Sequence, residues 1–240
     1  MSTVAHGSTK RRSPEVLRAI ADRGDAELAG ASAEDLITWS AMEFGGNVVA
    51  TQSMANAALS TLVAAIAPNI PVVFVDTGYH FAETLDTLER VRTRTGLTIV
   101  SVSSRVSVEE QSEHYGPDLW SRDPDLCCSI RKVRPLEDVL ANHEAWLTGM
   151  RRGAAGARRA ARAIDYDAKR NVVKVSPILD WSDADLAAFT AEHAVEVSPL
   201  LSQGFPSIGC RPCTRPVAPG EDPRAGRWSG FDKVECGIHQ

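Results

Sequence analysis

The five cysteines of the chain fall into three groups whose spacing points to metal binding and to nucleophilic chemistry. Cys127 and Cys128 are adjacent, Cys210 and Cys213 are separated by two residues, and Cys236 stands alone near the C-terminus. Thiolates are soft ligands that favour zinc, copper(I) and iron–sulfur clusters, and four of them saturate one such centre. We therefore expect the two pairs to bind a metal centre and the single cysteine to act as a nucleophile.

The adjacency of the first pair bears on the kind of metal centre. Structural zinc sites usually space paired cysteines by two to four residues, so that both side chains turn toward one ion. Neighbouring cysteines suit a cluster better because they can bind different irons, although ferredoxins also use a two-residue spacing. The spacing thus favours iron–sulfur and leaves zinc as an alternative. The plainest alternative makes the first pair small core residues and the second a redox dithiol.

Length and charge limit the class of protein. The chain has 240 residues, 43% of them hydrophobic, and a formal net charge of −5, which predicts a globular protein with one sizeable core. A net negative charge does not indicate a nucleic-acid-binding protein, which usually carries an excess of basic residues. The basic residues 10–12 precede no apolar signal segment, and no apolar run approaches the about 18 residues of a membrane helix. We expect a cytoplasmic, reducing location without membrane or nucleic-acid partners.

Short segments rich in valine and isoleucine alternate with helical patterns. The expected strands cover residues 47–51, 71–76, 98–102 and 145–148, and the expected helices cover 54–66, 79–95 and 131–141. Serine N-caps predict two more helices, one from Ser32 to near Gly45 and one over 182–193. This rhythm predicts an α/β fold, a three-layer sandwich with a mainly parallel sheet.

Ligands of such sheets bind beyond the carboxyl ends of the strands, which directs attention to residues 51–56, 76–80 and 149–152. The first of these loops lacks the glycines of a Walker loop, so ATP cleavage by a P-loop is not indicated. The cations of Lys132, Arg224 and Arg227 suit phosphate or sulfate, although a single such residue is more often a solvated surface charge.

The chain is expected to divide into three parts. Residues 1–12 form a disordered lead-in, residues 13–200 an α/β nucleotide-binding domain, and residues 201–240 a segment that carries two metal ligands and a tail over the active site.

Several segments together resemble the assimilatory sulfonucleotide reductases of the PAPS/APS reductase family, specifically the iron–sulfur type that acts on adenosine 5′-phosphosulfate (APS). The similarity runs from about Asn47 to His239. Its most specific parts are residues 75–80, 127–132, 205–214, 226–228 and 235–239.

The resemblance implies an adenine-nucleotide α-hydrolase-like fold and a [4Fe–4S] cluster on Cys127, Cys128, Cys210 and Cys213. It also implies an enzyme of sulfate assimilation that reduces APS to sulfite and AMP. In such an enzyme Cys236 attacks the substrate sulfur and becomes an S-sulfocysteine, which thioredoxin or a similar dithiol protein cleaves.

The resemblance and the strand-end loops together assign eight residues to substrate binding: Thr51, Ser53, Val75, Lys132, Gly149, Arg158, Arg224 and Arg227. The chain departs from the family pattern at Asn56, where an acidic residue is usual, and over residues 153–159. A reductase of the 3′-phosphorylated nucleotide (PAPS) and a non-enzymatic adenylate-binding iron–sulfur or zinc protein remain alternatives. Whether the protein forms a homo-oligomer is left open.

Overall fold

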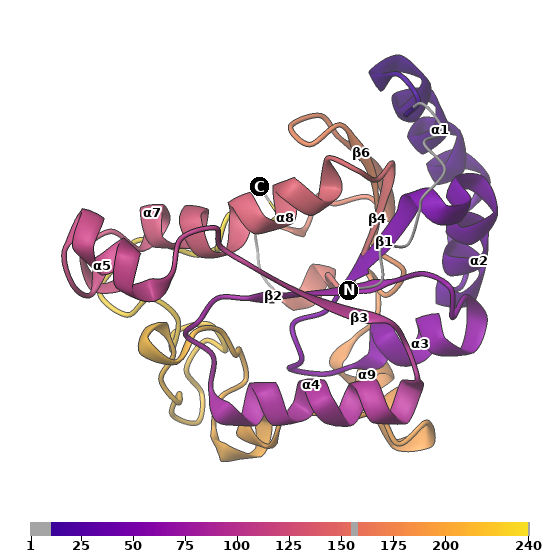
Figure 1. Ribbon diagram of the computed structural model, residues 1–240. Coiled ribbons are helices and arrows are strands. Elements are labelled where there is room, and N and C mark those ends of the chain that lie inside the picture. The colour runs from indigo at the N-terminus through magenta and orange to yellow at the C-terminus, as the bar shows by residue number, and fades with distance from the viewer. Residues whose placement is uncertain (1–10, 155–157, 240) are drawn as a thin grey trace.

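A six-stranded sheet forms the centre of the computed structural model, which describes residues 11–154 and 158–239 (Figure 1). The strands run in the order β3-β2-β1-β4-β6-β5, and all neighbours are parallel except the antiparallel pair β5–β6. Their bounds are Val48–Thr51 (β1), Val72–Asp76 (β2), Ile99–Ser103 (β3), Ala145–Thr148 (β4), Ile164–Asp167 (β5) and Val172–Val175 (β6). The four expected strands are thus confirmed, and the β5–β6 hairpin is additional.

Helices cover both faces of this sheet. They are α1 (Pro14–Glu27), α2 (Ala33–Phe44), α3 (Ala58–Ile66), α4 (Ala82–Thr95), α5 (Val108–Tyr115), α6 (Leu119–Arg122), α7 (Pro124–Cys128), α8 (Arg134–Leu140) and α9 (Asp183–Glu192). The α2 helix begins as the sequence predicts, because Ser32 Oγ accepts from the backbone N–H of Asp35 at 3.1 Å and the Asp35 carboxylate accepts from the Ser32 N–H.

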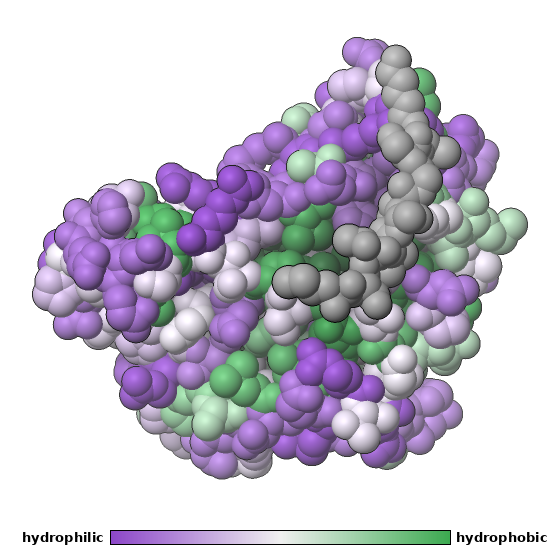
Figure 2. All heavy atoms as spheres, in the orientation of Figure 1, coloured by the Kyte–Doolittle hydropathy of each residue, from purple (hydrophilic) through white to green (hydrophobic). Residues whose placement is uncertain are grey.

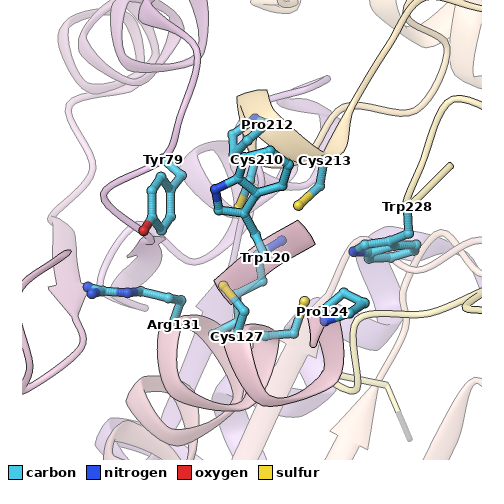
Figure 3. Close-up of a pocket in the computed structure, with 11 residues that line it drawn as sticks. Tyr79, Trp120, Pro124, Cys127, Arg131, Cys210, Pro212, Cys213 and Trp228 are labelled. Atoms are coloured by element: carbon cyan, nitrogen blue, oxygen red, sulfur yellow. The ribbon is translucent and has the colours of Figure 1, made fainter. Parts of the chain in front are cut away.

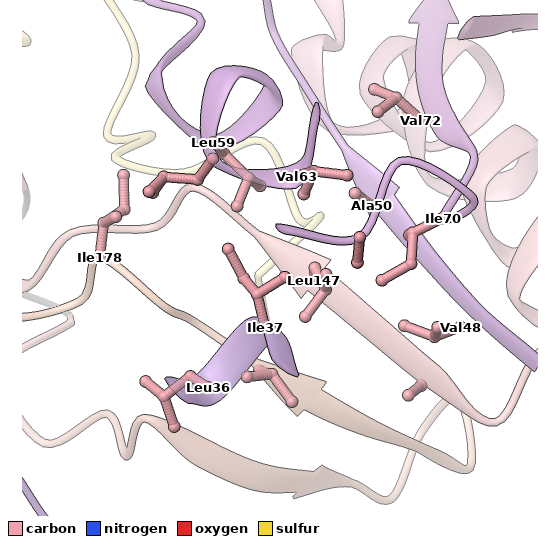
Figure 4. Close-up of a cluster of buried hydrophobic side chains, with 14 of the residues drawn as sticks. Leu36, Ile37, Val48, Ala50, Leu59, Val63, Ile70, Val72, Leu147 and Ile178 are labelled. Carbon is pink, nitrogen blue, oxygen red and sulfur yellow. The ribbon is translucent and has the colours of Figure 1, made fainter. Parts of the chain in front are cut away.

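Alternate residues of each central strand enter two separate hydrophobic layers. In β1, Val48 and Ala50 pack with α2 and α3, whereas Val49 packs with α8 on the opposite face. The larger layer contains fully buried residues such as Ile37 and Leu147 (Figure 4). A parallel sheet buried on both faces explains why its strands are almost continuously apolar. The expected three-layer α/β sandwich is confirmed.

The smaller layer is completed by the C-terminal tail. Ile238 packs against the cluster that contains Trp146 of β4 and Leu136 of α8. The His239 ring stacks on Trp146 with centroids 5.5 Å apart and planes 7° apart. The tail therefore covers the sheet beside α8, and so contributes to the core as well as to the site.

The outer surface carries mainly hydrophilic residues on the face shown in Figure 2, with hydrophobic residues gathered toward its centre. None of the helices within residues 11–154 and 158–239 is long and apolar enough to span a bilayer. Residues 1–10 of the expected lead-in lie outside the described residues. Arg12 is fixed to the body of the protein, because its backbone N–H and its Nε both donate to the buried Glu144 carboxylate, at 2.6 and 2.8 Å.

Candidate active site

A cavity of about 1330 Å³ lies at the carboxyl ends of β1, β2 and β4. The strand order reverses here, because the chain leaves β1 toward β2 on one side and later returns to β4 on the other. Open α/β sheets bind ligands at such a switch point, where the two loops diverge and leave a crevice. The fold itself therefore places a ligand site beside Thr51 and Gly149.

All the residues expected to bind substrate line this one cavity, together with the expected nucleophile. They are Thr51, Ser53, Val75, Lys132, Gly149, Arg158, Arg224, Arg227 and Cys236. They come from the ends of three strands, from the turn before α8, and from the C-terminal segment. The fold thus brings together residues that are up to 185 positions apart in the sequence.

The loop after β1 is held by its own polar side chains. Thr51 Oγ1 accepts a hydrogen bond of 2.7 Å from the indole of Trp146, so one face of this hydroxyl is already occupied. The Gln52 amide donates to the Asn56 carbonyl at 2.7 Å, and the Asn56 amide donates to Thr190 at 3.0 Å. Asn56 therefore ties the loop to α9, a role that a neutral amide fills as donor and acceptor.

Four of the cysteines line a second, narrower cavity, as the sequence predicts for the metal ligands. Cys127 and Cys128 end α7, and Cys210 and Cys213 flank a short 3-10 turn over Arg211–Cys213. Figure 3 shows the thiols of Cys127, Cys210 and Cys213 facing a common space. Residues 82 positions apart, at 128 and 210, thus meet in one soft donor set.

Local structure explains how each pair reaches this space. The Asp123 side chain caps α7 by accepting from the Leu126 N–H at 2.9 Å, and a π-helical turn over Ser129–Val133 follows the cysteines. The second pair is tied to the loop after β2, because Arg211 N–H donates to the Tyr79 carbonyl at 2.7 Å. Cys210 Sγ also lies 3.3 Å from Thr77 Oγ1.

Burial favours the protonated form of Cys127, Cys128 and Cys213 unless a cation binds to them. It raises the pKa of Cys127 to about 11 and that of Cys213 to about 12, and neighbouring thiolates add to both shifts. Burial raises the pKa of Cys128 as well. A bound metal centre would supply the missing positive charge and release these protons.

The spacing of the four thiols bears on the kind of metal group. In a tetrahedral zinc site with Zn–S of about 2.3 Å, the sulfurs would lie only about 3.8 Å apart. Within the described parts of the chain, no three His, Cys, Asp or Glu side chains are gathered closely enough to hold a single ion. Four soft thiol donors around one cavity could hold either a zinc ion or a cluster of several metal atoms.

Lys132 and Trp228 line both cavities and so form a shared wall. Lys132 is 9% exposed and makes no ion pair with a carboxylate in the described residues. Burial opposes its charge, but attraction to Cys210 and Cys236 in their thiolate form outweighs that effect and raises the pKa of Lys132. The π-helical turn thus directs a permanent positive charge to the boundary between the cysteines and the larger cavity.

Two arginines of the C-terminal segment add positive charge. The guanidinium of Arg227 lies on the ring of Trp228 at 4.4 Å and passes so close to Gly209 that a Cβ there would lie 2.2 Å from it. Arg227 Nε is buried and has no hydrogen-bond partner among the described residues, which leaves a donor for a ligand. The pKa of Arg224 is lowered, chiefly by burial, despite the attraction of Glu235.

The remaining basic residues differ in their roles. Arg131, the chain neighbour of Lys132, is turned away from the larger cavity: its guanidinium donates to the side chain of Gln111 and to the backbone carbonyls of Val106 and Ser107. Its function is to fix the start of α5. Of the arginines in the 151–159 segment, Arg151, Arg158 and Arg159 line the cavity; the Arg158 side chain is largely buried, whereas Arg159 is exposed.

Two other arginines of that segment pair with carboxylates. Arg151 also lines the cavity but pairs with Asp183 at 2.8 Å, and Arg152 pairs with Asp180 at 2.7 Å. In the segment 153–159, which differs from the family pattern, residues 155–157 lie outside the described residues.

The C-terminal tail carries Cys236 into the larger cavity, where the cysteine is half-buried. The buried Glu235 carboxylate accepts from Arg158 Nε at 2.9 Å and pairs with Arg224 at 3.3 Å. Sequence reasoning missed this carboxylate, because an acidic residue in a terminal segment normally indicates a solvated charge. The pKa of His239 is well below its ordinary value through burial and nearby cations, so this imidazole is neutral and does not support a thiolate as a charge.

Comparison with known proteins yields one family and a set of close relatives. The family model described as phosphoadenosine phosphosulfate reductase domain matches residues 47–216. A protein of Streptomyces coelicolor named adenosine 5′-phosphosulfate reductase is 45% identical over 230 residues, covering 96% of this chain and 98% of that protein. Proteins of the same name from Mycolicibacterium smegmatis and Mycobacterium tuberculosis are 45% and 41% identical, covering 93% and 97% of this chain and 94% and 98% of theirs.

Solved structures show the same fold at lower sequence identity. The crystal structure of phosphoadenylyl-sulfate reductase from Candida auris in a phosphate complex has a TM-score of 0.71 and 22% identity, covering 90% of this chain and 100% of that one. The FMN adenylyltransferase of Candida glabrata, in complex with FAD and pyrophosphate, has a TM-score of 0.52 and 17% identity, covering 89% and 69%. These likenesses agree with the adenine-nucleotide α-hydrolase-like architecture expected from the sequence.

The family match covers well over half of the chain, and the relatives above 40% identity extend over nearly all of it. The chain therefore belongs to the phosphoadenosine phosphosulfate reductase domain family.

Proposed function

We propose that this protein reduces adenosine 5′-phosphosulfate to sulfite and AMP as an oxidoreductase of sulfate assimilation. The observation that carries the proposal is the position of Cys236, a half-buried thiol in the same cavity as Lys132, Arg158, Arg224 and Arg227 at the switch point of the sheet. The relatives named adenosine 5′-phosphosulfate reductase, at up to 45% identity, support the same reaction.

In the proposed reaction, the Cys236 thiolate attacks the sulfur of the phosphosulfate. The bond between sulfur and the bridging oxygen breaks, AMP leaves with the electron pair, and Cys236 becomes an S-sulfocysteine. A thiolate of thioredoxin or a similar dithiol then attacks Cys236 Sγ and releases sulfite with the electron pair of the S–S bond. The second thiol of the donor resolves the mixed disulfide, so the donor is oxidised and Cys236 is restored.

The cations of the cavity suit the charge that develops on the leaving phosphate. Lys132, Arg224 and Arg227 are buried or largely buried, so their attraction to an anion is screened less than on the surface. Their side chains are fixed by packing, by contacts to the tail and by the ring of Trp228. We propose that these residues and Arg158 hold the phosphosulfate, and that Thr51, Ser53, Val75 and Gly149 contact the nucleoside.

We further propose a [4Fe–4S] cluster bound by Cys127, Cys128, Cys210 and Cys213. Four buried soft donors around one cavity support this group. When bound, it would supply a fixed local charge next to the shared wall of the two cavities. The chain's own part is to hold the four thiolates and to place Lys132 between them and the substrate.

The chain is proposed to work as two parts. Residues 13–200 would form the nucleotide-binding domain, and residues 201–240 would supply two cluster ligands, two substrate arginines and the nucleophile. Because the mechanism needs free thiols and a reduced dithiol donor, a reducing compartment such as the cytoplasm suits it.

The test is anaerobic sulfite release by the protein with reduced thioredoxin, comparing APS with its 3′-phosphorylated form at equal concentration. We expect a strong preference for APS. Cys236→Ser is expected to abolish sulfite release while AMP binding remains, and Asp232→Asn, at an exposed position of the same tail to which no role is assigned, serves as the control. Sulfite release at the unmodified rate by the Cys236→Ser variant would disprove the proposed role.

A further inference from the structure

The Glu235 carboxylate occupies a place that an anionic ligand would be expected to take. It is 4% exposed and bridges two guanidinium groups, with Arg158 Nη2 at 2.8 Å and Arg224 Nη2 at 3.3 Å. Both arginines line the large cavity, and both are among the proposed phosphosulfate ligands. A bidentate bridge of this kind resembles the way arginines bind phosphate.

Glu235 is directly joined to the proposed nucleophile in the chain. Arg224 also donates from Nε and Nη2 to the backbone carbonyl of Val234, at 3.2 and 2.7 Å. The segment Val234–Cys236 is therefore held through the same guanidinium groups that face the cavity. An anion that binds Arg158 and Arg224 would therefore weaken the hydrogen bonds that these arginines donate to Val234 and Glu235.

The charge balance favours such an exchange. Cations outnumber carboxylates among the described residues that line the cavity: they are Lys132, Arg151, Arg158, Arg159, Arg224, Arg227 and Lys233, against Asp183, Asp222 and Glu235. Of the three carboxylates, Glu235 is the one that pairs with Arg158 and Arg224. A nucleotide phosphosulfate brings two negative charges. The cations that do not pair with Glu235 attract the ligand. The bound ligand can also accept a hydrogen bond from Arg227 Nε, which has no partner among the described residues.

The tail also has anchors that do not depend on Glu235. Lys233 forms an ion pair with Asp125 in α7, next to the first cysteine pair, and lies over the Trp228 ring at 5.4 Å. The Gly237 carbonyl accepts from Arg170 Nη2 at 3.0 Å. Loss of the Glu235 contacts would therefore loosen the segment around Cys236 between two points that remain attached.

We propose that Glu235 is an internal competitor for the substrate anion: it holds the tail closed on Arg158 and Arg224 in the free protein, and nucleotide binding displaces it and loosens the segment that carries Cys236. The inference rests on the proposed function in that the nucleotide must bind in this cavity. It assigns to Glu235 a role in coupling nucleotide binding to tail mobility, apart from any step of the chemistry.

Calorimetric titration of AMP into the whole protein tests the competition. Glu235→Gln keeps the size of the side chain but removes its charge, so residue 235 no longer competes with AMP for Arg158 and Arg224. AMP should therefore bind more tightly, by about fivefold or more. Asp232→Asn is the matched control, since it removes an equal charge from an exposed position of the same tail. Its AMP affinity should change by less than about twofold, as expected for an exposed charge.

Hydrogen exchange of the peptide over residues 229–238 tests the coupling. AMP should speed exchange in the unmodified protein, and Glu235→Gln should show the faster exchange already without AMP. Unchanged or weaker AMP binding by Glu235→Gln, or slower exchange on adding AMP, would overturn the inference. Failure of AMP to bind the unmodified protein would instead overturn the proposed function, and the inference with it.

Discussion

The neutral His239, whose ring stacks on Trp146, predicts that docking of the C-terminal tail depends on pH. Burial lowers the pKa of this imidazole well below its ordinary value, and the nearby cations Lys174, Arg158, Arg170 and Arg224 lower it further. An undocked tail would leave the same imidazole in water, with an ordinary pKa of about 6.5. Protons therefore bind preferentially to the undocked state, and docking is weakened as pH falls below that value.

The size of the effect follows from this difference in proton binding. While the docked ring stays neutral, the ratio of docked to undocked tail falls by a factor of 1 + 10 raised to (6.5 − pH). That factor is about 1.1 at pH 7.5 and about 11 at pH 5.5, so docking should weaken about tenfold, or about 1.4 kcal/mol, between the two values. Above pH 7.5 no further gain is expected from this group.

Limited proteolysis at exposed tail residues such as Phe231 and Val234 measures the undocked fraction. Cleavage of an unstructured reference peptide at each pH corrects for the protease's own pH dependence. His239→Phe retains a flat ring to stack on Trp146 but does not titrate, so its corrected cleavage should change much less between pH 7.5 and 5.5. Equal pH dependence in both proteins would refute the reasoning and assign the effect to other groups.

Four further predictions concern stability and the metal site. Leu147→Ala, at a fully buried position of β4, should lower the free energy of unfolding by about 2–5 kcal/mol in urea denaturation. Glu144→Ala should cost about 2–3 kcal/mol, less than a fully buried pair, because Arg12 is 29% exposed. Gly226→Ala should loosen the C-terminal segment and speed its proteolysis, since a Cβ there would lie 2.2 Å from the Arg215 carbonyl oxygen. Cys210→Ser should lose visible absorbance and most iron and sulfide after anaerobic reconstitution.

Each of these predictions has an outcome that contradicts it. Losses below about 0.5 kcal/mol for Leu147→Ala or Glu144→Ala would show that these sites relax or are more exposed than the structure indicates. Unchanged proteolysis of Gly226→Ala would mean that the Arg215 backbone moves without cost. Full retention of iron and sulfide by Cys210→Ser would remove this residue from the ligand set.

The positions of the central strands were the most predictable part of the fold. Segments such as Val72–Asp76 are apolar on both faces, which is typical of a strand buried in a parallel sheet. The β5–β6 hairpin was not predicted, because Ile164–Asp167 alternates apolar and polar residues over only four positions. Helix α1 was missed because its polar positions outnumber the four residues it buries, and its stability comes from packing on β5 and β6.

The gathering of the site residues followed from the fold class, since parallel strands bring their carboxyl ends to one edge. What sequence did not reveal were the partners of individual charges. Arg131 and Lys132 are neighbours with similar chemistry, but a π-helical turn sends one to backbone carbonyls and the other to the cavity wall. The pairing of Glu235 with Arg158 joins positions 77 residues apart and depends on how the tail folds back.

The wall that Lys132 and Trp228 form between the two cavities has a practical consequence for inhibitor discovery. A compound that fills the larger cavity and contacts this wall would meet two side chains that also line the cavity of the four cysteines. If the four cysteines hold the proposed metal group, screening on protein without that group would select molecules for a different charge behind this wall. Metal content measured on every screening batch would be as informative as protein concentration.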